Sequence, residues 1–329
     1  MCSSEHFLVF TQLRKDPATA TANSNVILSL KGLKKSYGDL LAVNDLSLDV
    51  FQGEVFGFLG PNGAGKTTAI KMICGLLKSD GGEIFLAGQS LNKNYRECKR
   101  LIGLCPETLI IWESLTCLEQ LEFMGQQYDL SRLAARKKAL ELLEIFGLSH
   151  ARHKLAKTLS GGMKRRLNIA LALVHDPEIL ILDEPQAGLD PQSRILVREY
   201  IRSLSPRMTV VLTTHDMDEV DRLAHRVGII DHGQLLVLDT PQNLKDRLGS
   251  SDILEIKLIN GQEERLEELR KSLPENLRGF TYQEGTLRLV DLDTRAVLPA
   301  LLEAFQRTRL ETQDITIRKK TLEDVFIDL

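Results

Sequence analysis

The stretch Gly60-Pro61-Asn62-Gly63-Ala64-Gly65-Lys66-Thr67-Thr68 decides the fold, because it fits G-x-x-x-x-G-K-[ST]. It stands between an apolar run, Val55–Leu59, which predicts a strand, and Ala69–Ile73, which predicts the opening of a helix. In such a loop the backbone N–H groups point at phosphate oxygens, Lys66 reaches the β- and γ-phosphates, and the Thr67 hydroxyl ligates Mg²⁺. The stretch predicts a nucleoside-triphosphate site, with a merely tight glycine-rich turn as the alternative. The dinucleotide fingerprint G-x-G-x-x-G is not matched here, which argues against a nicotinamide cofactor.

The composition is that of a soluble globular protein, with 329 residues, 43% hydrophobic and 26% charged. No apolar run approaches the about 18 residues that cross a bilayer, and the N-terminal stretch lacks the features of a secretion signal, so we expect a cytoplasmic protein. The five cysteines show no C-x-x-C pair and predict neither a disulfide framework nor a zinc site. The formal net charge is −3, and neither half of the chain is basic enough to predict nucleic-acid binding.

Two strands downstream of the loop end in polar side chains. Ile179–Leu182 is wholly apolar and continues into Asp183 and Glu184, the pattern of a buried parallel strand that delivers carboxylates to its C-terminal edge. Asp183 would belong to the Mg²⁺ shell, and Glu184 would take a proton from the attacking water. The strand Met208–Thr214 ends at His215, which is either a packing and capping residue or a contact for the γ-phosphate.

Three further features have two interpretations each. Leu159–Met163 precedes a helix and offers glycine-flanked N–H groups to an anion, although taken alone it is only a helix cap. Tyr37, upstream of the phosphate loop, is either half-buried packing or a platform for a base. The cluster Lys164-Arg165-Arg166 is interpreted as a solvated helix face.

The chain divides into a tail, a large α/β domain and a smaller C-terminal domain. Residues 1–25 are small, polar and without period, which predicts disorder, and residues 26–248 form the α/β domain. This domain contains an antiparallel β-subdomain near its start and an inserted α-helical subdomain over about 92–177, whose apolar stripe is interpreted as core. Residues 251–329 spell βαββαβ, a small α+β domain of ferredoxin-like type, to which we assign an accessory or regulatory role.

Taken together, the motifs resemble those of the ATP-binding subunit of an ABC transporter, with the resemblance extending from Val26 to about Leu248. They follow in order: the phosphate loop, the signature Leu159–Gly162, the Asp183-Glu184 pair, the loop that ends at Asp190, and His215. Within this family the motifs resemble those of exporters of drugs, antibiotics and polysaccharides, which pair one nucleotide domain with a separate membrane subunit. The resemblance implies a P-loop NTPase fold of the ABC type.

The resemblance also implies a mechanism in which two such domains face head to tail, with ATP between the phosphate loop of one and the signature of the other. Tyr37 would stack on adenine, Lys66 and His215 would contact phosphate, and Glu184 would polarise water. The residues so implied to bind nucleotide are Tyr37, Gly60, Pro61, Asn62, Gly63, Ala64, Gly65, Lys66, Thr67, Thr68, Ser160, Gly161, Gly162 and Asp190; those implied to hold Mg²⁺ are Thr67, Asp183 and Glu107.

Glu107 departs from the family pattern, which usually has a glutamine in the loop that touches both Mg²⁺ and the membrane subunit. A carboxylate oxygen can still ligate a hard cation, and the alternative is a solvated loop acid. The expected partners are membrane-spanning permease subunits and a second nucleotide domain, either a copy of this chain or a close paralogue. The permease subunits would hold the protein on the cytoplasmic face of the membrane. The alternatives are a soluble ABC-type ATPase not engaged in transport and a nucleotide-gated switch without turnover.

Overall fold

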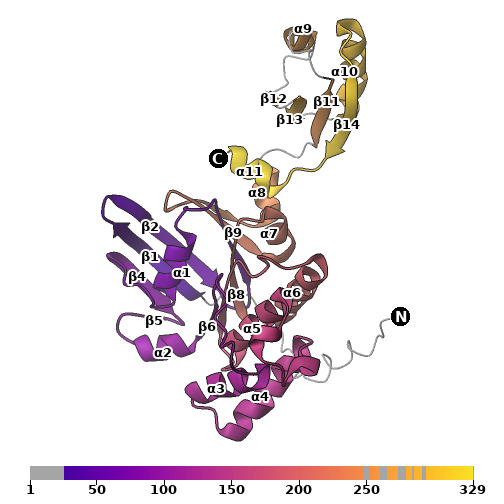
Figure 1. Ribbon diagram of the computed structural model, residues 1–329. Helices are drawn as coiled ribbons and strands as arrows, with labels where there is room; N and C mark the ends of the chain where they lie inside the picture. The colour runs from indigo at the N-terminus through magenta and orange to yellow at the C-terminus, as the bar shows by residue number, and fades with distance from the viewer. Residues whose placement is uncertain are drawn as a thin grey trace, which may run out of the picture.

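The structure, a computed structural model, describes residues 26–247, 252–259, 265–272, 279–283, 285–290 and 294–328. The predicted tail 1–25 and the predicted domain boundary at 248–251 lie outside these residues. The described chain forms a large unit, residues 26–247, and a smaller unit that projects from it beyond helices α8 (Pro241–Arg247) and α11 (Leu322–Asp328) (Figure 1).

A six-stranded sheet forms the centre of the large unit, and its phosphate-loop strand is an inner one. In spatial order the strands are β10 (Gln234–Asp239), β9 (Arg226–Asp231), β3 (Val55–Leu59), β8 (Thr209–Thr214), β7 (Ile179–Asp183) and β6 (Ile102–Cys105). From β9 to β6 the neighbours are parallel, so their C-terminal ends meet at one edge. Strand β7 is buried on both faces, with Ile179 and Ile181 in one hydrophobic cluster and Leu180 and Leu182 in another, which explains why its sequence shows no polar alternation.

An antiparallel sheet packs against the central sheet through helix α1 (Lys66–Ile73), since one hydrophobic cluster contains residues of all three. Its strands, in spatial order, are β2 (Leu40–Phe51), β1 (Val26–Tyr37), β4 (Gly81–Leu86) and β5 (Gln89–Ser90). Strand β1 extends to Tyr37. The alternating sequence pattern predicts a shorter strand, because register shifts between Leu30 and Ser36 interrupt the two-residue period.

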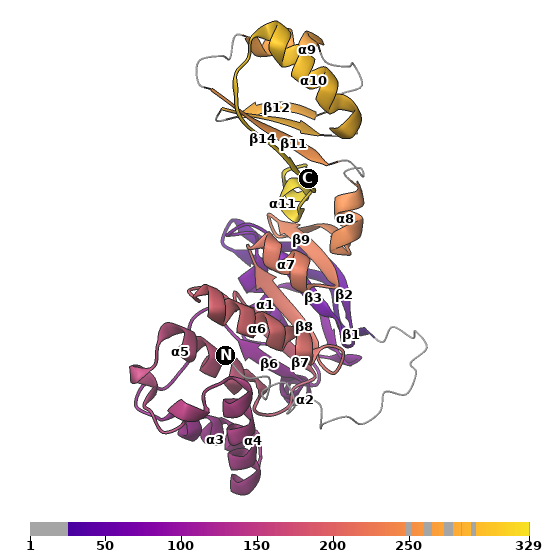
Figure 2. The same ribbon diagram turned by 90° about the vertical axis from the view of Figure 1, so that its right-hand side faces the viewer.

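The predicted helical insertion, residues 92–177, does not consist of helices alone. Residues 92–177 include β6, which is a strand of the central sheet, and the short helix α2 (Tyr95–Arg100) that precedes it. The helical part proper is built from α3 (Cys117–Gln127), α4 (Arg132–Ile145) and α5 (Gly161–Leu173), and its apolar stripe packs in the same hydrophobic cluster as the central sheet (Figure 2). The remaining helices of the large unit are α6 (Pro191–Leu204), α7 (Met217–Leu223) and α8 (Pro241–Arg247).

The smaller unit has the element order that the sequence predicts, β-α-β-β-α-β. Its elements are β11 (Ile253–Leu258), α9 (Leu266–Ser272), β12 (Gly279–Gln283), β13 (Thr286–Val290), α10 (Thr294–Thr308) and β14 (Thr312–Arg318). The four strands form an antiparallel sheet in the order β12-β13-β11-β14. Leu254 and Ile256 of the inner strand share a hydrophobic cluster with Leu269 of α9 and Leu301 of α10.

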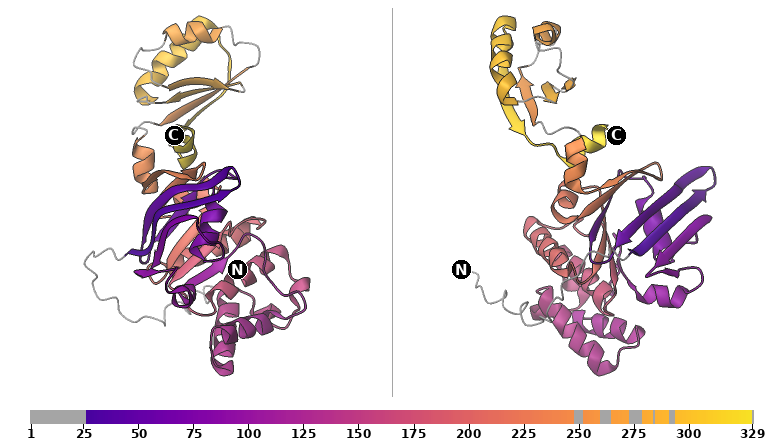
Figure 3. Two further views of the ribbon diagram at one scale, coloured as in Figure 1. Left: turned by 90° about the vertical axis from the view of Figure 1, so that its left-hand side faces the viewer. Right: turned by 180° about the vertical axis from the view of Figure 1, so that it is seen from behind.

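The last helix, α11 (Leu322–Asp328), packs its apolar side on the large unit, while its Asp324 pairs with Arg318 and Arg288 of the smaller unit, which corrects the expectation that residues 251–329 form a separate module. It lies against α7 and α8 of the large unit (Figures 2 and 3). Leu322 and Val325 are buried in a cluster with Leu59, Val220, Val227, Ile229 and Leu244. The sequence did not reveal this return, because periodicity shows that a helix has an apolar face but not which surface covers it.

Candidate nucleotide site

The phosphate loop connects the buried strand β3 to α1, and at two of its glycines, Gly60 and Gly65, a larger residue would collide with a backbone carbonyl oxygen. Gly65 precedes the helix at φ +101°, and a Cβ there would lie 2.3 Å from the carbonyl oxygen of Ala42. No side chain caps the N-terminus of α1. Its first N–H groups are therefore available for an anion, which the helix dipole also favours.

Lys66 is buried at the base of this loop. Its ammonium group donates hydrogen bonds to the carbonyl oxygens of Gly60, at 2.6 Å, and Pro61, at 3.0 Å. Burial lowers the pKa of Lys66, and the negative charges of Glu184, Asp183 and Glu107 oppose that shift. The lysine is thus a charge held among backbone oxygens and acids, positioned to neutralise a polyphosphate.

A cavity of about 340 Å³ opens over the loop and brings together most of the predicted site. It is lined by Tyr37, Leu40, Ala42, Asn62, Gly63, Gly65, Lys66, Thr67, Thr68, Glu107, Asp183, Glu184, Ala187 and His215. Of the loop residues, Gly60, Pro61 and Ala64 lie behind its lining; Gly60 is packed so closely that a Cβ would lie 2.2 Å from the carbonyl oxygen of Ile230.

The carboxylates at the end of β7 are fixed by the neighbouring strand β8. Asp183 is 5% exposed and accepts a hydrogen bond from the Thr213 hydroxyl. Glu184, at φ +48°, accepts hydrogen bonds at Oε1 from the His215 N–H, at 3.0 Å, and at Oε2 from the Thr214 hydroxyl, at 3.2 Å. The Nδ1 atom of His215 lies 2.9 Å from the same Oε1. The acid and the histidine therefore form one hydrogen-bonded pair at the mouth of the cavity, although 31 residues separate them in the chain.

Three residues with oxygen donors in their side chains, Thr67, Asp183 and Glu107, line this cavity from three different segments of the chain. Oxygen ligands of this kind suit Mg²⁺. Within the part of the chain that the structure describes, no group of three or more His, Cys, Asp or Glu could hold a metal by itself. The donor set fits a cation that takes its remaining ligands from water and nucleotide phosphates.

Tyr37 stands at the end of β1 and lines the outer part of the cavity with its ring 49% exposed. The Lys35 ammonium lies 5.8 Å from the centre of the ring and is paired with Asp80 at 2.7 Å. The half-exposed face supports the interpretation as a platform for a base over that as packing.

The signature residues and Asp190 lie outside the cavity lining. The Ser160 hydroxyl caps α5 by accepting the N–H of Met163, at 3.3 Å, while Asp190 caps α6 by accepting the N–H and hydroxyl of Ser193. A Cβ on Gly162 would lie 2.9 Å from the Ser193 hydroxyl oxygen, so the two caps are packed together. One chain thus presents two features of a kind that binds phosphate, the phosphate loop and the signature residues, and they do not line the same cavity.

Arg165 is the residue that the sequence interpretation placed wrongly. It was assigned to a solvated face, whereas it is 2% exposed and its guanidinium group bonds to backbone carbonyls around the two acids. The signal that could have located it is helical spacing, because Arg165 stands three and four residues before the buried Asn168 and Ile169.

Fold and site together define a P-loop nucleoside triphosphatase: a largely parallel sheet with a glycine-rich loop after β3, a buried lysine, and two carboxylates at the end of β7, two strands away. Residues 43–187 match the protein family described as ABC transporter. The chain is 37% identical over 307 residues to a linearmycin resistance ATP-binding protein of Bacillus subtilis, covering 92% of this chain and 98% of that protein. It is 39% identical to a daunorubicin/doxorubicin resistance ATP-binding protein of Streptomyces peucetius, covering 92% of each.

Among solved structures, the chain is similar to an ATP-binding cassette in a dimeric post-hydrolysis state bound to ADP and Pi, with a TM-score of 0.60 and 27% identity. That match covers 65% of this chain and 98% of the other. The chain belongs to the ATP-binding subunits of ABC transporters, and it binds and hydrolyses ATP. None of the helices in the described ranges is long and apolar enough to cross a membrane.

Proposed function

We propose that this protein binds MgATP between two nucleotide domains arranged head to tail and uses its hydrolysis to drive export through separate membrane-spanning subunits. The observation that carries the proposal is the separation of Ser160–Gly162 from the cavity that Lys66 and Glu184 line. A second domain, from another copy or a close paralogue, would bring its signature over this cavity. The dimeric cassette to which the chain is similar supports this arrangement.

In this proposal each residue of the cavity has one role. Lys66 neutralises the β- and γ-phosphates, Glu184 takes the proton of the attacking water, and His215 holds Glu184 and senses the γ-phosphate. Tyr37 stacks on the adenine. Thr67, Asp183 and Glu107 would hold Mg²⁺, which neutralises developing charge on the phosphate oxygens. Hydrolysis then releases the closed dimer, and this movement is passed to the membrane subunits.

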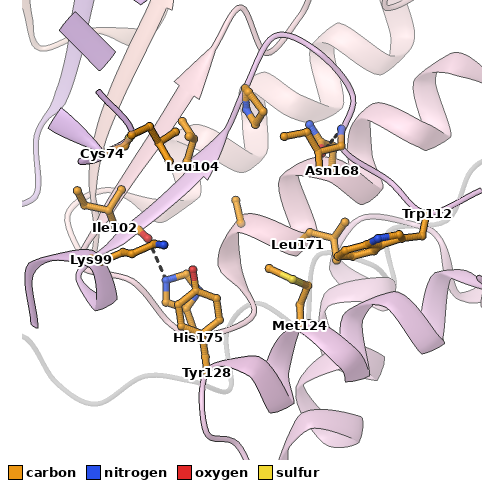
Figure 4. A pocket seen from close by; sticks show the side chains of 14 residues that line it. Cys74, Lys99, Ile102, Leu104, Trp112, Met124, Tyr128, Asn168, Leu171 and His175 are labelled. Atoms are coloured by element: carbon orange, nitrogen blue, oxygen red, sulfur yellow. Dashed lines mark hydrogen bonds between the residues drawn. The ribbon is translucent and has the colours of Figure 1, made fainter. Parts of the chain in front are cut away.

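A second cavity, of about 190 Å³, supports docking of a membrane subunit beside Glu107 (Figure 4). Pro106 and Ile110 of the Glu107 loop line it together with Trp112, Met124 and Leu171. Ile110 and Trp112 are 58% and 40% exposed, and Phe123 packs edge-on against Trp112. An exposed aromatic and aliphatic patch of this kind marks a protein contact, here for a partner at the membrane. Such docking would place this protein on the cytoplasmic face of the membrane.

Paired substitutions test the ATPase assignment. Lys66→Ala should abolish ATP binding, since no second ammonium lines the cavity. Glu184→Gln should bind ATP and form a dimer, yet hydrolyse it about 10²- to 10⁴-fold more slowly, the usual contribution of a general base. Matched controls are Lys71→Ala, on the exposed face of the same helix, and Glu83→Gln, an exposed acid on β4. If Glu184→Gln kept more than about a tenth of wild-type hydrolysis, the general-base role would be wrong.

Purification from native membranes in mild detergent tests the transport assignment. A membrane-spanning subunit should co-purify and should be lost when Trp112 and Ile110 are replaced by Ser. Retention of ATPase activity with no membrane partner would instead favour the soluble ABC-type ATPase. ATP binding without turnover in the wild-type protein would favour the nucleotide-gated switch.

A further inference from the structure

The buried guanidinium group of Arg165 has all its hydrogen-bonding capacity committed to two backbone segments. Its Nε donates to Pro185 O at 3.0 Å. Nη1 donates to Pro106 O at 2.7 Å and Glu107 O at 2.9 Å. Nη2 donates to Asp183 O at 2.7 Å and Glu184 O at 2.6 Å. A guanidinium has five N–H donors, so each finds a carbonyl oxygen.

These carbonyls belong to the two segments that carry acids into the nucleotide cavity. Pro106 and Glu107 follow β6; Asp183 ends β7, the strand paired in parallel with β6, and Glu184 and Pro185 follow it. Glu184 adopts a left-handed backbone conformation, which L side chains rarely adopt and which the surroundings must hold. Arg165 therefore fixes the position of the Glu107 loop relative to the Glu184 turn.

The same helix face holds the Glu107 loop at a second point. Asn168, one turn after Arg165, accepts the Ile110 N–H at 3.2 Å and donates to Cys105 Sγ at 3.3 Å. The helix that carries both side chains, α5, begins at Gly161 with Ser160 as its cap. One rigid helix thus joins the signature to both acid-bearing segments of its own chain.

We propose that Arg165 is a positioning residue for hydrolysis that couples the two ATP sites of the dimer. This proposal rests on the head-to-tail arrangement proposed above. A displacement of the Glu184 turn or of the Glu107 loop, when nucleotide binds or is hydrolysed, moves α5 and with it Ser160–Gly162. In the dimer that signature belongs to the opposite site, so each site transmits its state to the other.

The test is Arg165→Lys, which keeps the positive charge and most of the buried volume. A lysine ammonium has three donors on a single atom and cannot reproduce the planar fork across two segments. We expect kcat to fall about tenfold or more, as for other residues that orient catalytic groups. KM for ATP should change less than about threefold, because the phosphate loop is untouched, and the Hill coefficient should fall toward one. Arg165→Met, which removes all five of these hydrogen bonds, should be less active still.

Arg202→Lys is the matched control, since Arg202 is exposed and gives one carbonyl bond, to Arg222 O. It should leave kcat, KM and the Hill coefficient unchanged. A merely structural role of Arg165 would lower the melting temperature and the folded fraction of Arg165→Lys but leave kcat per folded protein and the Hill coefficient at wild-type values, and that result would overturn the proposal.

The dimer is tested separately in the Glu184→Gln background. Sedimentation with ATP should show dimers for Glu184→Gln and fewer dimers, at equal ATP binding, for the Arg165→Lys/Glu184→Gln double variant. If Glu184→Gln itself forms no ATP-dependent dimer, the head-to-tail function fails. If both proteins form equal dimers, the coupling role of Arg165 fails while the proposed function stands.

Discussion

Replacing Leu322 by Ala should detach α11 from the large unit without unfolding it. Leu322 is 1% exposed and packs in the cluster that includes Leu59, the last residue before the phosphate loop. Removing a buried leucine side chain to the Cβ costs about 2.7–5 kcal/mol. Helix α11 has seven residues, and a helix that short is not stable by itself in water. The loss should therefore appear as undocking of this helix.

Taking about 3 kcal/mol, the docking equilibrium should fall about 100-fold. Native-state hydrogen exchange followed by mass spectrometry measures this directly, since the amides of α11 exchange in proportion to the undocked fraction. Exchange in the peptide covering α11 should accelerate by about that factor, with a smaller effect in α8 and none in the central strands β3 and β7.

Ile327→Ala is the matched control, because Ile327 stands on the same helix with 63% of its surface exposed. It should leave the exchange rates near those of wild type. Equal exchange of α11 in Leu322→Ala and Ile327→Ala would refute the conclusion that this cluster holds the helix. Faster exchange throughout the large unit would show instead that α11 is part of its cooperative core.

The remaining predictions concern the cavity and the base of α11. Tyr37→Ala should weaken ATP binding about tenfold and Tyr37→Phe should not, as measured by titration calorimetry, because stacking needs the ring and not the hydroxyl. Glu107→Gln should hold or modestly raise affinity for MgATP, whereas Glu107→Ala should impair partner-stimulated ATPase and transport more than basal hydrolysis; equal activity in all three assays would make Glu107 a solvated acid. Burial raises the pKa of Asp324, but hydrogen bonds from Arg318 and Thr321 outweigh it and hold that pKa at about 2. A carboxylate whose pKa is lower in the folded state stabilises that state above its unfolded value of about 3.9, so the link between α11 and Arg318 of β14 should weaken as pH falls from about 4 toward 2, and Asp324→Asn should lose that dependence.

The sequence predicts the phosphate loop, its flanking strand and helix, and the Asp183-Glu184 edge because each depends on local order. A buried strand must be apolar on both faces, and a phosphate loop needs glycine at fixed spacing. The roles of individual residues in that site stay predictions. The order of elements in the smaller unit follows equally from periodicity.

What the sequence could not show depends on contacts between distant segments. Arg165 was taken as solvated because arginine usually is, and only the fold brings the carbonyls of Glu107 and Glu184 to it. The range of the helical insertion is too wide because the strand pattern of Ile102–Cys105 does not show which sheet it joins, and its partner, β7, is 77 residues further on (179 − 102). The sequence does not show that the apolar side of α11 packs on the large unit, because the residues that cover it come from β3, α7, β9 and α8.

Because α11 returns to the large unit, the smaller unit is attached to the large unit at two points. The chain leaves the large unit after α8, which ends at Arg247, and comes back at Leu322, where α11 lies against α8. Residues between these helices are therefore an insertion anchored at both ends and not a tail on a single tether, so their swing is restricted from two sides. The excision that leaves the large unit whole is one that joins α8 to α11 by a short linker; a cut near residue 250 also removes the cover from Leu59 and Val220.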